Sequence, residues 1–152
     1  MLFNSIEFIL LFLPAVLLGY WFCVTFLKEN SAKYWLIASS LFFYAWWEVS
    51  YLLIIVLSMV INYRVGVLIF HFEKFKRVLL FISILANLGV LGYYKYSNFF
   101  IDQINIGLGY GLEFEKVLLP LAISFFTFQQ IAYLVDASRG EVKSYGFIDY
   151  CL

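Results

Sequence analysis

Charge is scarce in this sequence. Charged residues make up 13% of its 152 positions, which is about half the share that is usual in a soluble domain. Apolar side chains make up 64% of the chain and raise its mean hydropathy to +0.92. This composition excludes an ordinary soluble domain and indicates a membrane protein. The 10 basic residues equal the 10 acidic ones, so no excess of positive charge would attract nucleic acid.

Histidine and cysteine are nearly absent. The single histidine, His71, excludes a metal site built from several histidines, and it has no nucleophile arranged beside it. We interpret it as a solvated loop residue. Cys23 and Cys151 lack the spacing of metal ligands, and we interpret both as small apolar residues without a disulfide. Residue types alone therefore predict no catalytic residue, no metal site and no tightly bound cofactor.

Apolar runs alternate with short polar segments along the chain, which predicts an all-α, polytopic membrane protein. About five transmembrane helices are expected, at 6–27, 34–47, 52–70, 78–100 and 117–135, with loops at 28–33, 71–77 and 101–116. The run 34–47 is short, so its full crossing of the bilayer is left open. No basic region precedes the first run and no small-residue cleavage site follows it. The first helix is therefore not interpreted as a removable signal peptide.

Lysine and arginine are distributed unevenly between the two sides that five crossings would define. Eight of them fall on one side and two on the other, which places the first side in the cytoplasm and the N-terminus outside. The first set is Lys28, Lys33, Arg64, Lys74, Lys76, Arg77, Arg139 and Lys143, and the second is Lys95 and Lys116.

The stretch 117–140 combines an apolar run with polar side chains in its middle. At helical spacing, several of them share one broad side, where lipid offers no hydrogen-bonding partner. They either bind neighbouring helices or line a cavity through which something polar passes. Asp136 and Arg139 are predicted to pair at the end of this helix, with Gly140 as its C-terminal stop. The candidate tunnel-lining or packing residues are Ser124, Thr127, Gln129, Gln130 and Tyr133.

Four segments, taken in this order, resemble the membrane-bound O-acyltransferase (MBOAT) superfamily. They are MLFNSIEFILLFLP (1–14), SSLFFYAWW (39–47), GYYKYSNFF (92–100) and LPLAISFFTFQQIAYLVDASRGE (119–141). The similarity is closest to the bacterial alginate O-acetyltransferase branch and covers nearly the whole chain. Ala122, Gln130 and Ser138 depart from the residues that are usual in the family, which affects the packing expected around this stretch.

The resemblance implies a ring of tilted helices around a tunnel, in which an acyl donor meets the hydroxyl of a polysaccharide. It also implies that residues 1–152 are the N-terminal part of one such domain, because the family's catalytic histidine belongs to a later segment and His71 does not match it. The tail GFIDYCL (146–152) resembles the start of the next helix. The expected partners are the bilayer, the rest of the domain, and a soluble acyl carrier or a periplasmic acetyltransferase; the acyl donor stays unidentified. The chain alone is expected to insert into the membrane and to be catalytically inactive.

Two other classes of function stay open from the sequence. A membrane scaffold or partner-binding protein would keep the helices without the chemistry. A small transporter or channel would use the polar side of 117–135 as its pathway. The sequence has no charged residue in mid-membrane and no visible repeat to support transport.

Overall fold

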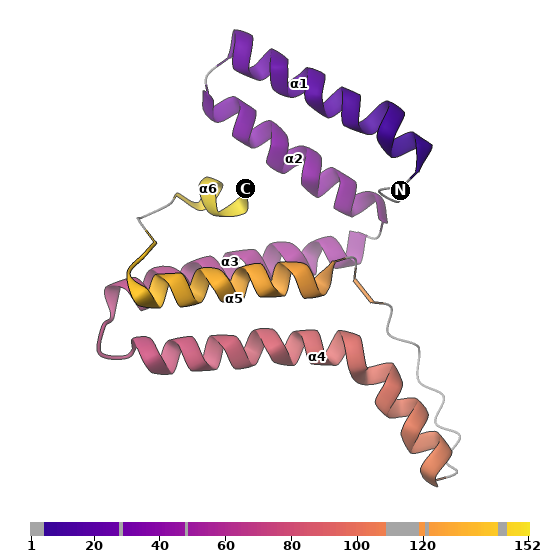
Figure 1. Ribbon diagram of the computed structural model, residues 1–152, viewed down its shortest axis with the longest axis vertical. Coiled ribbons are helices and arrows are strands. Elements are labelled where there is room, and N and C mark those ends of the chain that lie inside the picture. Colours follow the sequence, from indigo (N-terminus) through magenta and orange to yellow (C-terminus); the bar gives the residue numbers. More distant parts are fainter. Residues whose placement is uncertain (1–4, 28, 48, 109–118, 121, 143–145) are drawn as a thin grey trace. The chain divides into compact units, whose positions relative to one another are not determined.

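The computed structural model describes residues 5–27, 29–47, 49–108, 119–120, 122–142 and 146–152. The chain divides into two compact units, residues 1–63 with 143–152 (unit 1) and residues 64–142 (unit 2). Every regular element in the described ranges is a helix (Figure 1). The predicted all-α class is therefore confirmed.

Unit 1 begins with a helical hairpin. A π-helix, η1 (Phe8–Phe12), continues directly into α1 (Leu13–Phe26), and α2 (Glu29–Trp47) packs alongside it (Figure 1). The change from π to α geometry falls beside Pro14, which has no N–H to donate to the preceding turn. The first helix thus begins with a π-helical turn, which is wider than an α-helical one, just before the proline.

Helices α1 and α2 approach each other closely at Gly19. The Trp35 ring of α2 occupies the space above this glycine, so a Cβ there would lie 2.4 Å from the ring. The same indole donates a hydrogen bond from Nε1 to the Val16 carbonyl of α1, 2.9 Å away. One tryptophan therefore provides both the packing and a polar link between the two helices.

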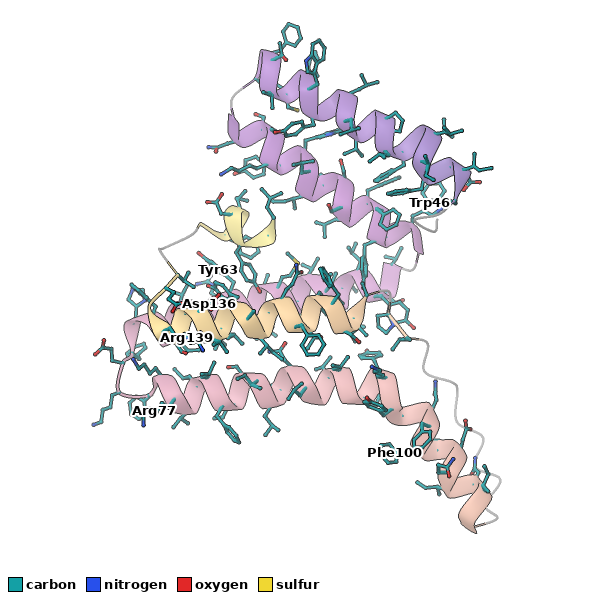
Figure 2. The ribbon with its side chains drawn as sticks, viewed as in Figure 1. Trp46, Tyr63, Arg77, Phe100, Asp136 and Arg139 are labelled. Atoms are coloured by element: carbon teal, nitrogen blue, oxygen red, sulfur yellow. The ribbon has the colours of Figure 1, made fainter. Side chains whose placement is uncertain are left out.

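Aromatic rings also join η1, where the hairpin begins, to the last turns of α2, where it ends. Phe43 of α2, which is buried, contacts Phe8 with ring centroids 5.2 Å apart and Phe12 with centroids 5.6 Å apart. Phe42 stacks on Phe12 at 6.4 Å and contacts Trp46, whose side chain is exposed (Figure 2). Such ring pairs stabilise the contact beyond the apolar area that they bury.

Unit 1 is completed by a short helix, α6 (Phe147–Cys151), and by the first part of α3 (Val49–His71). Phe147 and Tyr150 of α6 contact the Tyr63 ring, with centroids 5.1 and 5.5 Å apart. The Lys33 ammonium of α2 lies 2.5 Å from the Asp149 carboxylate. Both side chains of this ion pair are partly exposed, so the rings contribute more than the charges to holding α6.

Unit 2 packs the end of α3 against α4 (Lys76–Leu108) and α5 (Ile123–Arg139). Helices α4 and α5 lie side by side and run in opposite directions (Figure 1). Helix α4 bends in its second half, where the Ser97 hydroxyl donates to the Tyr93 carbonyl; such a bond within one helix favours bending. The core of the unit consists of Ile69, Leu134 and Ala137, with Val65, Leu79, Leu80, Tyr133 and Val142 around them.

All three predicted loops are wrong in part. Of the predicted loop 71–77, only 72–75 lies outside the helices. Helix α2 begins at Glu29, inside the predicted loop 28–33, because glutamate, alanine and lysine are good helix formers. Helix α4 continues to Leu108, through the first half of the predicted loop 101–116. Its glycine-rich part, 109–116, lies outside the described residues.

Three helical segments of the described chain are long and apolar enough to cross a membrane: Phe8–Phe26, Val49–His71 and Lys76–Gly107. Helices α2 and α5 are not among them. The fold is thus that of a membrane protein, whereas the expected total of about five crossings stays a prediction.

We expect Gly19→Ala to destabilise the α1–α2 hairpin by about 1–3 kcal/mol, because the new methyl group would overlap the Trp35 ring. Gly89→Ala is the matched control, since nothing lies within 4 Å of a Cβ at position 89. The control is expected to be neutral or to stabilise its helix by up to about 1 kcal/mol. Unfolding of the purified chain in mixed micelles, followed by circular dichroism, measures both. Equal stability of the two variants would contradict the close packing at Gly19.

Candidate functional site

Backbone geometry defines where the polar helix α5 begins and ends. Pro120, which is buried, lies just before the helix. Ala122, which is exposed and has a φ of 56°, directly precedes the first helical residue, Ile123. The predicted start of this helix at residue 117 is therefore wrong: Leu119 and Pro120 are not helical, and the left-handed Ala122 sets a turn before the helix. At the other end, Gly140 has a φ of 77°, and its N–H donates to the Ala137 carbonyl. The predicted stop at Gly140 is confirmed.

One stripe of α5 is buried. Its members recur every three or four residues, as expected for one face of a helix: Ile123, Phe126, Thr127, Gln130, Leu134 and Ala137. Thr127 and Gln130 are thus part of the packed face, with 2% and 5% of their surfaces exposed. The Thr127 hydroxyl donates to the Ile123 carbonyl, 2.7 Å away, so it is satisfied within its own helix.

The other candidate residues of this helix lie elsewhere on its surface. Ser124 and Tyr133 are half-buried at the flanks of the stripe, and Gln129 is exposed. Phe125 and Phe128, which are 66% and 62% exposed, share the open side with Gln129. The single polar side expected from the sequence is therefore divided between a packed face and an open one.

Helix α4 brings buried polar groups to the same unit. Ser83 and Asn87 are both buried and lie one turn apart. The Ser83 hydroxyl donates to the Leu79 carbonyl at 2.6 Å, and the Asn87 amide donates to the Ser83 carbonyl at 2.8 Å. Helix α4 packs on α5, and both helices have buried polar residues. Asn87 therefore belongs to the packed face of α4.

Sequence reasoning missed two features of this packing. Ser83 precedes Asn87 by four residues, and Ser58 precedes the buried Asn62 of α3 by the same spacing, with the Asn62 amide donating to the Ser58 carbonyl at 2.9 Å. This repeated Ser-x3-Asn spacing was the available signal. Gly89 and Gly92, by contrast, face open space.

The glycine that does allow close packing in unit 2 is Gly66 of α3. A Cβ at this position would lie 2.3 Å from the ring of Tyr133 and 2.6 Å from its hydroxyl oxygen. Tyr133 therefore reaches the backbone of α3 across Gly66 and links it to α5. A glycine within an apolar helix was the only sequence signal for this contact.

The charged residues at this end of unit 2 form no catalytic arrangement in the described part of the chain. Asp136 and Arg139 were predicted to pair, but no ion pair joins them (Figure 2). The predicted pair is therefore wrong. The end of the helix is closed by backbone bonds, among them the one from the Glu141 N–H to the Asp136 carbonyl at 3.0 Å. His71 is exposed at the end of α3, with Nδ1 2.8 Å from the Val67 carbonyl. No group of three potential metal ligands occurs among the described residues.

Adjacent glutamines of α5 allow a matched test of its two faces. Gln130→Ala is expected to lower the stability of the chain by about 1–3 kcal/mol, because it removes buried volume from the packed face. Gln129→Ala, at an exposed position, is expected to change stability by less than about 0.5 kcal/mol. Both are measured by unfolding in mixed micelles. A larger loss for Gln129→Ala would show that the wrong face of α5 has been identified as packed.

Comparison with known proteins gives a consistent set of relatives. The chain is 44% identical to a peptidoglycan O-acetyltransferase of Helicobacter pylori over 91% of its own length and 27% of that protein. It is 36% identical to a probable alginate O-acetylase, AlgI, of Pseudomonas aeruginosa over 99% of its length and 30% of the relative. The corresponding protein of Pseudomonas syringae is 35% identical over 95% of the chain and 28% of the relative. No family model matches the chain, and no solved structure matches it.

The chain thus spans less than a third of the length of these curated relatives. Within that span the similarity is nearly continuous, and it agrees with the apolar helices of the fold. Nearly the whole chain is therefore homologous to part of an O-acetyltransferase of the membrane-bound O-acyltransferase superfamily.

Proposed function

We propose that this chain is the N-terminal part of a membrane O-acyltransferase that transfers an acyl group, an acetyl group by resemblance, to a hydroxyl of a cell-surface or exported polysaccharide. The observation that carries this proposal is identity of 44% and 36% over 91% and 99% of the chain to two O-acetylating proteins. The names of these relatives refer to peptidoglycan and alginate, and a polysaccharide hydroxyl is the acceptor that the two have in common.

The contribution of this chain is structural support of the reaction site, and none of its residues is proposed as a catalyst. Thr127 and Gln130 hold α5 within unit 2, as their burial indicates. The exposed Gln129 and the half-buried Ser124 are then available to line the tunnel wall. An exposed glutamine in an apolar helix needs protein or water as its surroundings, because lipid would leave its amide unsatisfied.

The proposed location is the cytoplasmic membrane, with the N-terminus outside. The apolar helices support a membrane location, and the excess of lysine and arginine on one side supports the orientation. The proposed partners are the rest of the acyltransferase domain and a soluble acyl carrier or a periplasmic acetyltransferase. The alternative is a membrane scaffold without catalysis, which the close helix contacts at Gly19 and Gly66 would suit.

The gene itself tests the proposal. Sequencing past the codon of Leu152 in all three frames is expected to find a frame that continues into further apolar helices carrying the family's histidine. A host without O-acetylated polysaccharide should then release base-labile acetate when it expresses the longer reading frame. It should release none when it expresses residues 1–152 alone.

Two results would contradict the proposal in different ways. Acetate release by the 152-residue chain alone would show that this part is itself catalytic. A continuation that lacks further helices, or a long frame that inserts without acetylating, would leave the scaffold as the better explanation. Within an active long protein, Gln129→Ala is expected to lower turnover about tenfold or more while protein abundance stays unchanged, whereas Thr127→Val is expected to preserve turnover, since its hydroxyl bonds only within α5.

A further inference from the structure

The connection between α3 and α4 must lie at a membrane surface. Both helices are long and apolar enough to cross a bilayer, and they are joined by the turn 72–75. The turn is closed by backbone bonds, from the Phe72 N–H to the Leu68 carbonyl and from the Phe75 N–H to the Phe72 carbonyl. A turn of four residues between two crossing helices is short, so we expect its side chains to lie near the level of the lipid headgroups.

The side chains of 72–77 are of two kinds. Phe72 and Phe75 are 54% and 56% exposed, although large apolar rings gain by leaving water. Lys74 and Arg77 are exposed and Lys76 is half-buried, whereas Glu73 is the single acidic residue of the segment. The segment therefore presents two rings and a net positive charge together. The Lys74 ammonium lies 5.9 Å from the centre of the Phe75 ring, so charge and ring are neighbours.

The end of α5 brings further charge to this end of unit 2. Ala137 of α5 and Ile69 of α3 belong to one buried cluster, and Leu79 and Leu80 of α4 pack against that cluster. The last turns of α5 therefore lie near the start of α4. Arg139, which is exposed, lies at the same end as Arg77 (Figure 2). Asp136 and Glu141 are also here, and they offset Arg139 locally. Among the described residues at this end of unit 2, the excess of positive charge thus lies in the segment 72–77.

We propose that the segment 72–77 is a binding surface for anionic phospholipid headgroups. Phe72 and Phe75 enter the boundary between headgroups and acyl chains, and Lys74, Lys76 and Arg77 contact the lipid phosphates. Rings beside cations suit this boundary, because the apolar part leaves water while the charges remain in it. Each lysine or arginine near an anionic membrane surface strengthens binding by about fivefold. The surface needs no catalysis, so it holds for the chain whether or not it is part of an acyltransferase.

The test uses the purified 152-residue chain in maltoside micelles. Native mass spectrometry measures how much phosphatidylglycerol the chain retains against an equal amount of phosphatidylcholine. The wild-type chain is expected to prefer phosphatidylglycerol, and added salt should reduce the preference. Lys74→Gln is expected to weaken it about fivefold, and the triple variant Lys74→Gln, Lys76→Gln, Arg77→Gln about a hundredfold. Phe72→Ser with Phe75→Ser is expected to reduce retention of both lipids.

Lys95→Gln is the matched control. Lys95 is also exposed and also lies close to a ring, 5.6 Å from the centre of Tyr96, but no second cation follows within the next turn. An equal loss for Lys95→Gln and Lys74→Gln would overturn the proposal. So would equal retention of both lipids by the wild-type chain, or displacement of phosphatidylglycerol by millimolar inorganic phosphate, which would indicate a site for a free anion. Circular dichroism of each variant separates loss of binding from loss of folding.

Discussion

The packing of α4 and α5 depends on one constraint: a polar side chain on an apolar helix must find its partners in protein. Thr127 and Ser83 meet this constraint within their own helices, by donating to the carbonyls of Ile123 and Leu79. Burial of Gln130 and Asn87 in the same unit removes amides that lipid could not satisfy. The polar residues of α5 are thus used first for assembly, and only those left on the open side remain for other roles.

Close contact in both units relies on an aromatic ring placed over a glycine. Trp35 covers Gly19 in unit 1, and Tyr133 covers Gly66 in unit 2. In each case a flat ring lies against backbone, which gives a large contact area without a neighbouring Cβ. The two rings also carry polar groups, and the Trp35 indole uses its own to bind the Val16 carbonyl. The abundance of aromatic residues, 22% of the chain, therefore serves packing between helices as well as contact with lipid.

The open side of α5 relates the fold to the proposed function. Phe125, Phe128 and Gln129 form a surface that is part apolar and part polar, which suits contact with more protein better than contact with lipid alone. The relatives are more than three times as long as this chain, since it covers 27% of the Helicobacter pylori protein and 30% of the Pseudomonas aeruginosa protein. A reaction site would then lie outside the described helices, with α5 as one of its supports.

Composition and hydrophobic patterning were sufficient to predict helices and a membrane location. The family was predicted from the resemblance of four sequence segments. The turn at Gly140 was also predictable, because a left-handed position at a helix end favours glycine. The helix boundaries were less predictable: glutamate and lysine at the start of α2 read equally well as a loop, and a helix-forming Ala122 adopts a left-handed conformation before α5.

The two faces of α5 were decided only by tertiary structure. Gln129 and Gln130 are chemically identical neighbours, and helical periodicity places them 100° apart without indicating which one meets a partner. Likewise, nothing in the sequence distinguishes Gly66, which a tyrosine covers, from Gly89, which faces open space. Sequence determines which side chains a helix carries in each direction. Which direction is buried depends on the position of the neighbouring helices, because burial is a property of the packed unit and not of the residue.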